Sequence, residues 1–282
     1  MLSKCYGDDA QPDARPPPPP AAAADGHSHS HEHGDHSSEV VALGTVQLQG
    51  STFAVDREGE CEAGKSCTFG VEAVGAAREA PSDAWVENAA GERVCEPVTG
   101  EGHDKHWHFT IAPAAGAAAP ARFVLRLGDA TERIALAAGA APRHDGILTP
   151  LRRGAGGEAV GFAELKLHDD AGDLELWLSG AAGGGAEPLD VPAATVITLA
   201  FPSHGGRSIE LRVRNGEQNE DEDGVPNMRG GRTCYFIFPG ETGADPEWLK
   251  GESWRGVVEL AFESEGVNFA CDPFVLVPHS VL

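Results

Sequence analysis

Residues 161–178 read Gly161-Phe-Ala-Glu-Leu-Lys-Leu-His-Asp-Asp-Ala-Gly-Asp-Leu-Glu-Leu-Trp-Leu178. Apolar and polar residues alternate on both sides of a central Asp/Gly-rich segment. Because successive side chains of a β-strand point to opposite faces, this period of two predicts two strands with one apolar face each. Asp and Gly in the segment Asp169–Asp173 favour a tight turn. The stretch therefore predicts an antiparallel β-hairpin that buries one of its faces.

Short runs with the same alternation recur after residue 40, separated by Gly, Pro, Asn and Asp. About seven of them fall before residue 137, and a second series follows a linker at 138–143, a spacing typical of β-sandwiches. Helical patterns are nearly absent, and only Asp245–Lys250 predicts a single helical turn. We therefore expect an all-β protein with two consecutive immunoglobulin-like antiparallel β-sandwiches, residues 41–140 and 141–282. One large mixed sandwich is the alternative.

The first forty residues have a different composition. They contain Pro16–Pro20, Ala21–Ala24 and a histidine-rich run, with almost no branched apolar residues. Such a segment cannot bury enough apolar surface to offset its loss of conformational entropy. We expect residues 1–40 to form a disordered tail with a polyproline II spacer in the middle.

The charge of the chain restricts its partners. Lys and Arg together number 21 against 44 Asp and Glu, which gives a formal net charge of minus 23. A surface of that sign repels phosphate backbones, so nucleic acid is not an expected partner, whereas cations are attracted. No apolar run approaches the ~20 residues that cross a bilayer, so we expect no transmembrane segment.

Leu2-Ser3-Lys4-Cys5, followed by a tether rich in Asp, Gly and Pro, resembles the end of a bacterial lipoprotein signal. That resemblance implies a lipid anchor on Cys5 and an extracytoplasmic location in the periplasm or cell envelope. A cytosolic protein with an ordinary flexible terminus is the alternative.

The tail contains the densest group of metal-ligating side chains. Five of the 12 histidines fall within ten residues, at His27, His29, His31, His33 and His36. Neutral imidazole is a preferred ligand of Zn and Cu, and a flexible ribbon can chelate without a preformed pocket. We expect this arm to bind Zn or Cu; a passive, solvated spacer is the alternative.

A second group of histidines lies in Gly102-His103-Asp-Lys-His106-Trp-His108. On a strand, His106 and His108 share one face while Trp107 turns to the other. Together with His103 they could supply three ligands to Zn or Cu, with His144 as a distant fourth. The alternative is a polar outer face of an edge strand.

Oxygen-bearing side chains alternate in Asn219-Glu-Asp221-Glu-Asp223-Gly224. This spacing matches the first half of a calcium-binding loop, although Gly230 stands where the bidentate Glu is expected. Calcium bound by Asn219, Asp221 and Asp223 would need a further ligand such as Glu217 or Asn227. Without calcium the segment is an ordinary charged hairpin loop.

The cysteines allow two pairings. Cys234 with Cys271 and Cys61 with Cys67 could form disulfides in an oxidising compartment, and Cys95 would then be left over. Buried, reduced cysteines that act as small apolar residues are equally compatible with the pattern.

We find no sequence motif that indicates an enzyme. Gly59-Glu-Cys-Glu-Ala-Gly-Lys-Ser66 matches the phosphate-binding P-loop pattern, but a strand-like run and not a helix follows it. Glu60 and Glu62 would also repel phosphate. The segment is therefore interpreted as a hairpin turn, and we expect no enzymatic activity.

In layout, a His-rich tail on β-sandwich domains resembles bacterial periplasmic metal-handling proteins, including copper-associated sandwich domains and metal-efflux adaptors. This resemblance implies a non-enzymatic protein that buffers or presents Zn or Cu. The alternative function is an adhesion, glycan-binding or envelope-structural module that is stabilised by Ca and binds a glycan or another envelope protein. In that case exposed Trp248 and Trp254 would form a sugar platform.

Overall fold

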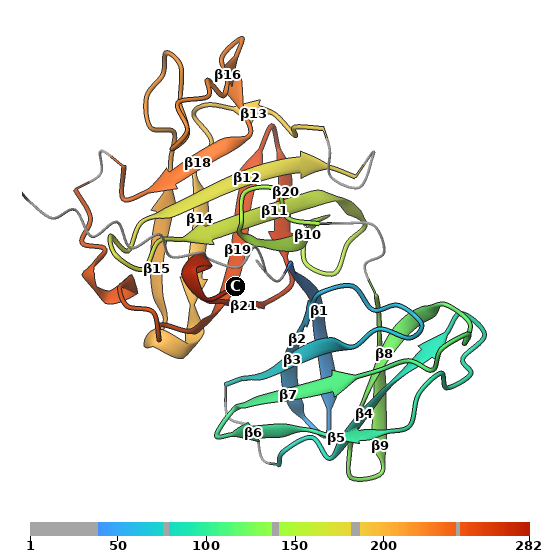
Figure 1. Cartoon of the computed structure of the whole chain (residues 1–282). Coiled ribbons are helices and arrows are strands. Elements are labelled where there is room, and N and C mark those ends of the chain that lie inside the picture. Colours follow the sequence, from blue (N-terminus) through green and yellow to red (C-terminus); the bar gives the residue numbers. More distant parts are fainter. Residues whose placement is uncertain (1–38, 76–78, 137–140, 182–186, 241–242) are drawn as a thin grey trace, which may run out of the picture. The chain divides into compact units, whose positions relative to one another are not determined.

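The structure is a computed structural model that describes residues 39–75, 79–136, 141–181, 187–240 and 243–282 (Figure 1). Residues 37–282 cluster as one compact unit. The described residues form β-strands and three 3₁₀ turns, which are Pro202–His204 (η2), Glu247–Leu249 (η4) and His279–Val281 (η5). The all-β prediction is therefore confirmed, and Glu247–Leu249 supplies the single turn expected near Asp245. No helix in the described residues is long and apolar enough to cross a membrane.

The first series of strands follows the predicted alternation. Its members are β1 Val40–Leu48, β2 Ser51–Glu58, β3 Cys67–Val74, β4 Asp83–Asn88, β5 Val98–Thr99, β6 Glu101–His103, β7 His106–Ile111, β8 Pro120–Leu127 and β9 Ala130–Ala135. Strands β1, β2, β3, β7 and β6 are hydrogen-bonded in that order, and β5, β4, β8 and β9 form a separate four-stranded sheet. The P-loop lookalike ends at a turn that leads directly into β3, so no helix N-terminus is present there.

The second series continues the same large sheet. Its members are β10 Ile147–Arg153, β11 Ala159–Leu167, β12 Leu174–Gly180, β13 Val191–Pro192, β14 Ile197–Phe201, β15 Arg207–Leu211, β16 Met228–Arg229, β17 Arg232–Thr233, β18 Tyr235–Phe238, β19 Gly256–Ser264, β20 Val267–Cys271 and β21 Phe274–Leu276. Strand β10 pairs in parallel with β1 and antiparallel with β11 and β20. The order β10, β11, β12, β18 then forms one branch of the sheet (Figure 1).

Two large hydrophobic clusters hold these strands together. One contains Phe53, Phe69, Phe109 and Phe123 with other residues of the first series, and the other contains residues of the second series such as Leu165 and Leu176. Strand β1 contributes to both, because Val41 belongs to the first cluster and its neighbour Ala42 to the second. The predicted division of the folded chain near residue 141 stays a prediction.

The predicted tail lies almost entirely outside the described residues. Of residues 1–40 the structure describes only Glu39 and Val40, and Val40 already belongs to β1. The tail histidines and Cys5 therefore lie outside the described part of the chain.

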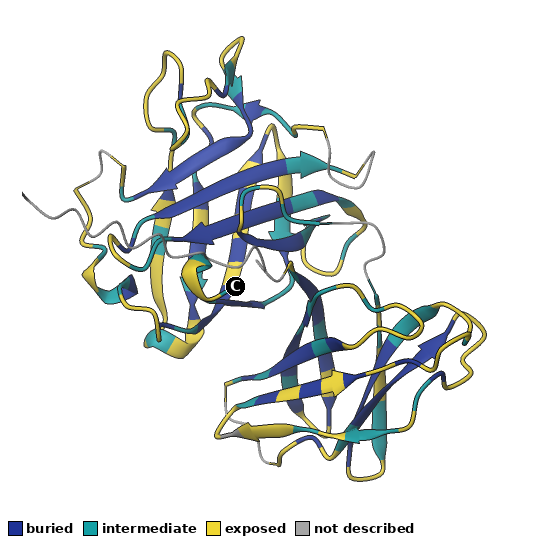
Figure 2. Cartoon of the chain, in the orientation of Figure 1, coloured by how far each residue is buried: buried dark blue, intermediate teal, exposed yellow. Residues whose placement is uncertain are grey.

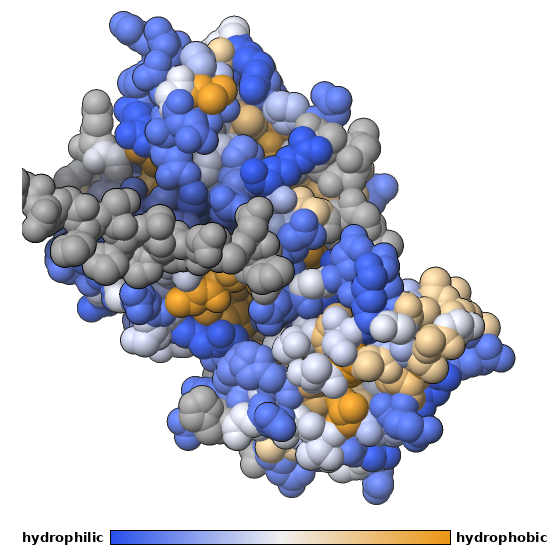
Figure 3. Space-filling model, in the orientation of Figure 1, coloured by the Kyte–Doolittle hydropathy of each residue, from blue (hydrophilic) through white to orange (hydrophobic). Residues whose placement is uncertain are grey.

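Strands β12 and β18 are buried on both of their faces, as the dark blue ribbons in Figure 2 show. Leu174, Leu176 and Leu178 of β12 enter the hydrophobic cluster, while Glu175 and Trp177 point to the other face and are only 2% and 6% exposed. On this outer face Trp177 forms a small hydrophobic cluster with Tyr235 and Ile237, and Glu175 lies opposite Ile237. The surface drawn in Figure 3 is largely hydrophilic, with hydrophobic atoms in separate patches.

Candidate metal centre

The rings of His106 and His108 meet on one face of β7. Their Nε2 atoms lie 2.6 Å apart, and the ring planes are nearly perpendicular with centroids 4.2 Å apart. Trp107 and Phe109 point the other way and are 6% and 0% exposed. The shared face expected from the period of two is thus present, and the two nitrogens converge on one point.

A carboxylate and a guanidinium contact Nδ1 of His106, the ring nitrogen that faces away from His108. Glu72 lies opposite His106 in the β3–β7 register, and its Oε2 is 3.2 Å from His106 Nδ1. Arg255 Nε donates to the same Oε2 at 2.8 Å, and Arg255 Nη2 lies 2.9 Å from His106 Nδ1. Burial alone would raise the pKa of Glu72, but hydrogen bonds with His106 and Arg255 outweigh it and leave that pKa below its usual range. Arg255 can only donate, so its Nη2 bonds to Nδ1 only when that nitrogen carries no proton. In the other tautomer Nδ1 carries the proton and donates to Glu72, and Nε2 presents its lone pair, as in metal-binding histidines oriented by a carboxylate.

Asp56 is a third candidate ligand, which sequence reasoning missed. Asp56, Gly70 and His108 lie in one row across β2, β3 and β7. Gly70 N–H donates to Asp56 Oδ1 at 3.2 Å, and a side chain at position 70 would overlap the carboxylate. Burial raises the pKa of Asp56, and the positive charges of Arg255 and His106 partly oppose this rise. A partly buried acid on the same face as the histidine pair would gain from a nearby cation.

The other predicted ligands have different placements. Backbone pairing sets His103 of β6 opposite His106, while the His103 side chain lies outside the described part of the structure. His144, the expected fourth ligand, stacks on Trp177 with ring centroids 4.1 Å apart. The structure therefore places His144 against the outer face of β12.

The calcium-like segment forms a loop in which the three expected ligands have separate roles. Asn219 is fully buried and donates to Thr233 Oγ1 and to the Tyr235 carbonyl, while its Oδ1 accepts from Arg214 N–H. Asp221 accepts from Val225 N–H and from the Asn227 amide, and Asp223 is exposed. Calcium binding in this loop stays a prediction.

A group that the sequence did not suggest lies beneath this loop. His168, Glu175 and Glu222 each direct one ligand atom to a common point, and these atoms lie within 4.8 Å of one another. The hydrogen bond with Glu175 raises the pKa of His168 above its usual value. The alternation along 161–178 predicts that Glu175 lies on the face opposite the leucines. It carries no information about Glu222, which lies in a loop more than forty residues later in the sequence.

The cysteines do not form either of the predicted disulfides in this structure. The five described cysteines, Cys61, Cys67, Cys95, Cys234 and Cys271, are free. The thiols of Cys61 and Cys67 are hydrogen-bonded to each other, which raises the pKa of Cys61 and lowers that of Cys67. Cys234 and Cys271 are buried, where they act as small apolar residues.

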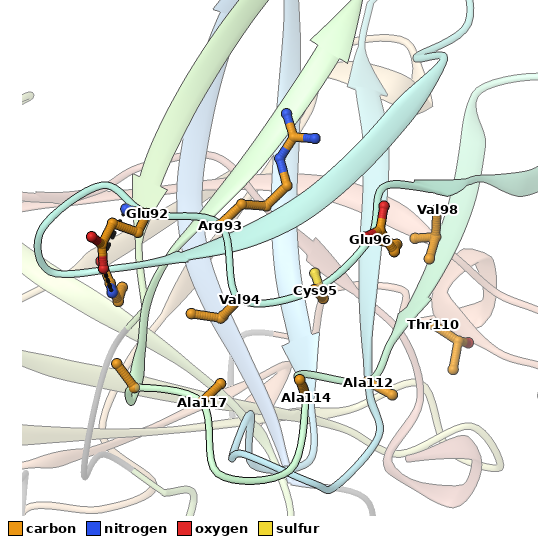
Figure 4. Close-up of a pocket in the computed structure, with 12 residues that line it drawn as sticks. Glu92, Arg93, Val94, Cys95, Glu96, Val98, Thr110, Ala112, Ala114 and Ala117 are labelled. Atoms are coloured by element: carbon orange, nitrogen blue, oxygen red, sulfur yellow. Dashed lines mark hydrogen bonds between the residues drawn. The ribbon is translucent and has the colours of Figure 1, made fainter.

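A wide cavity of about 790 Å³ surrounds Cys95 (Figure 4). Alanines 112, 114 and 117 line the side opposite Val94 and Cys95. Burial raises the pKa of the Cys95 thiol, although its sulfur accepts a hydrogen bond from Val86 N–H at 3.3 Å. Since the thiolate is the reactive form, this cavity does not present an activated nucleophile.

The two tryptophans considered for a sugar platform under the alternative function are not both exposed. Trp254 is 8% exposed and stacks on His204, and Trp248 is half-buried against Phe201. Trp254 belongs to the second hydrophobic cluster and so cannot form an exposed platform, and Trp248 packs against the same cluster.

In comparisons with known proteins, no family model matches the chain and no curated protein matches it significantly.

Proposed function

We propose that this protein binds divalent transition-metal ions, Zn²⁺ or Cu²⁺, without enzymatic turnover, and buffers them or presents them to another envelope protein. The observation that carries the proposal is the convergence of His106 Nε2 and His108 Nε2, 2.6 Å apart on one face of β7. A tetrahedral ion with Zn–N bonds of about 2.0–2.1 Å would require the rings to separate by less than about 1 Å.

The surroundings of the pair support this proposal. Glu72 fixes His106 from its Nδ1 side, and Asp56 offers an oxygen from the same face of the sheet. Imidazole with carboxylate is a ligand set that suits Zn²⁺ and Cu²⁺, and the net charge of minus 23 attracts cations.

The proposal also assigns roles to the tail and to the domains that carry this site. The His-rich arm would capture ions and the folded site would receive them. Two immunoglobulin-like sandwiches would carry the folded site, and a lipid anchor at Cys5 would hold the protein in the envelope, with the tail as a disordered tether. The composition of residues 1–40 and the resemblance of Leu2–Cys5 to a lipoprotein signal support this arrangement.

The test is a Zn²⁺ and Cu²⁺ titration of the full chain with all five tail histidines replaced by Ser. We expect His106→Ala with His108→Ala to remove one bound ion per chain, or to weaken its binding by at least about 100-fold. Thr110→Ala is the matched control, since Thr110 lies on the same exposed face of β7. Equal stoichiometry and affinity in the double variant and the control would contradict the proposal.

A further inference from the structure

We propose that His168, Glu175 and Glu222 form a second site for a divalent transition-metal ion, separate from the His106–His108 pair. His168 directly follows β11, Glu175 lies in β12, and Glu222 lies in the loop between β15 and β16. This site goes beyond the proposed function and does not depend on it.

The three ligand atoms already converge. His168 Nε2 lies 3.1 Å from Glu175 Oε2 and 3.6 Å from Glu222 Oε2. One imidazole and two carboxylates are a donor set for first-row divalent ions such as Zn²⁺ or Mn²⁺, and they lack the sulfur that would favour Cu⁺. Water or His279, whose ring centroid lies 4.8 Å from that of His168, could complete the coordination.

The outer oxygens of both carboxylates are held by other side chains. The Tyr235 hydroxyl donates to Glu175 Oε1, and Lys166 Nζ donates to Glu222 Oε1. Each carboxylate is therefore oriented with its second oxygen toward His168. Hydrogen bonds of this kind orient the ligands of known metal sites.

The group is rigid on one side and accessible on the other. The side chains of Glu175 and His168 are 3% and 15% exposed and belong to the sheet, whereas the Glu222 side chain is 41% exposed on the loop. An ion could reach the point of convergence when the loop moves aside, and binding would then fasten the loop to the sheet.

Asp173 provides a separate observation next to the site, because its carbonyl accepts a hydrogen bond from His168 N–H and its charge acts on His168. Its Oδ1 is buried and has no hydrogen-bond partner within the described part of the chain. A buried acceptor without a partner is costly and calls for an unseen ion or water.

Lys166 has a double effect on such a site. Its ammonium orients Glu222, but it also repels a cation at the same point. Replacing it with Gln would keep a donor near Glu222 and remove the repulsion.

The test uses the full chain with the five tail histidines replaced by Ser and with His106→Ala and His108→Ala. We expect this background to bind one Zn²⁺ per chain in competition with a chromophoric chelator. Glu222→Gln and His168→Ala should each weaken binding by at least about tenfold. Asp223→Asn, which removes the adjacent exposed acid, is the matched control and should bind normally. Lys166→Gln should bind Zn²⁺ more tightly.

Two outcomes would overturn this proposal. One is that the background chain shows no saturable Zn²⁺ binding. The other is that Glu222→Gln and Asp223→Asn weaken Zn²⁺ binding equally. Circular dichroism verifies that each variant is folded. If a substitution at a buried position unfolds the chain, Glu222→Gln still tests the site, because Glu222 is exposed. Failure of the β7 site leaves this result unchanged, because the background lacks His106 and His108.

Discussion

Glu164 is a buried carboxylate that accepts hydrogen bonds from backbone groups of one turn. It accepts N–H hydrogen bonds from Arg143, His144 and Gly146 at 2.6–3.1 Å and is 4% exposed. Charge-assisted bonds of this kind are stronger than neutral ones. The side chain thus fixes the segment that precedes β10.

We expect Glu164→Gln to lower the free energy of unfolding by about 1.5–3 kcal/mol, because an amide group turns a donor toward backbone donors. Urea denaturation followed by circular dichroism measures the change. Glu158→Gln, an exposed acid on the neighbouring turn, should shift the midpoint little. A similar midpoint for both variants would show that the three N–H groups find other partners.

Single residues also show where sequence reasoning succeeds. His106 and His108 could be paired from the sequence because they lie two residues apart in a strand, where the period of two fixes their common face. His168 and Glu222 could not, since their meeting depends on the path of the loop after β15. Asn219 shows the same limit, because its spacing in the sequence does not indicate that its Oδ1 accepts a hydrogen bond from Arg214 N–H.

At the scale of elements, the alternation in the sequence does not predict β10, a strand that has three partners. Strand β10 contains Pro150, and a proline within an apolar run argues against a central strand because it lacks a backbone donor. Here β10 nevertheless pairs with β1, β11 and β20. Alternation predicted most of the other long strands, whereas the order in which they pair could not be derived from it.

The four-stranded sheet contains an ion pair between buried Glu87 and exposed Arg133 that should make stability depend on pH. Glu87 of β4 accepts from Arg133 of β9 at 2.9 Å and from Trp85 Nε1–H at 3.1 Å. The hydrogen bond from Arg133 lowers the pKa of Glu87 in the folded state, although burial opposes this. The pair therefore stabilises the fold above the unfolded-state pKa of about 4.3, and this contribution is lost as the pH falls through the lower folded pKa.

We expect Glu87→Gln to destabilise the protein by about 1 kcal/mol at pH 7 and to make the free energy of unfolding less dependent on pH below about pH 5. Denaturant unfolding at a series of acid pH values measures the slope. Glu132→Gln, an exposed neighbour on β9, is the control and should keep the wild-type slope. An unchanged slope in Glu87→Gln would contradict the assignment.

At the scale of the whole molecule, the proposed function predicts separate contributions of the tail and of the folded residues to metal binding. We expect the five tail histidines to bind additional Zn²⁺ or Cu²⁺, and this binding should weaken below about pH 6 because protonated imidazole is not a ligand. Calorimetry of the full chain against a variant with all five replaced by Ser measures the difference. Replacing only Ser28 and Ser30 by Ala should leave the stoichiometry unchanged. Equal stoichiometry in the histidine variant would exclude the arm as a ligand.

Strand β1 ties the first and second series of strands together, so neither series is expected to fold without the other. Val41 and Ala42 are adjacent in the chain but pack into different hydrophobic clusters, and β1 also pairs with β10. Cutting the gene near residue 141 would therefore separate β1 from one of the clusters it fills and leave an unpaired sheet edge on each fragment, where foreign strands could add. A substitution that disrupts the packing of one cluster would also displace β1 and so destabilise the other cluster. We therefore expect the two clusters to unfold together.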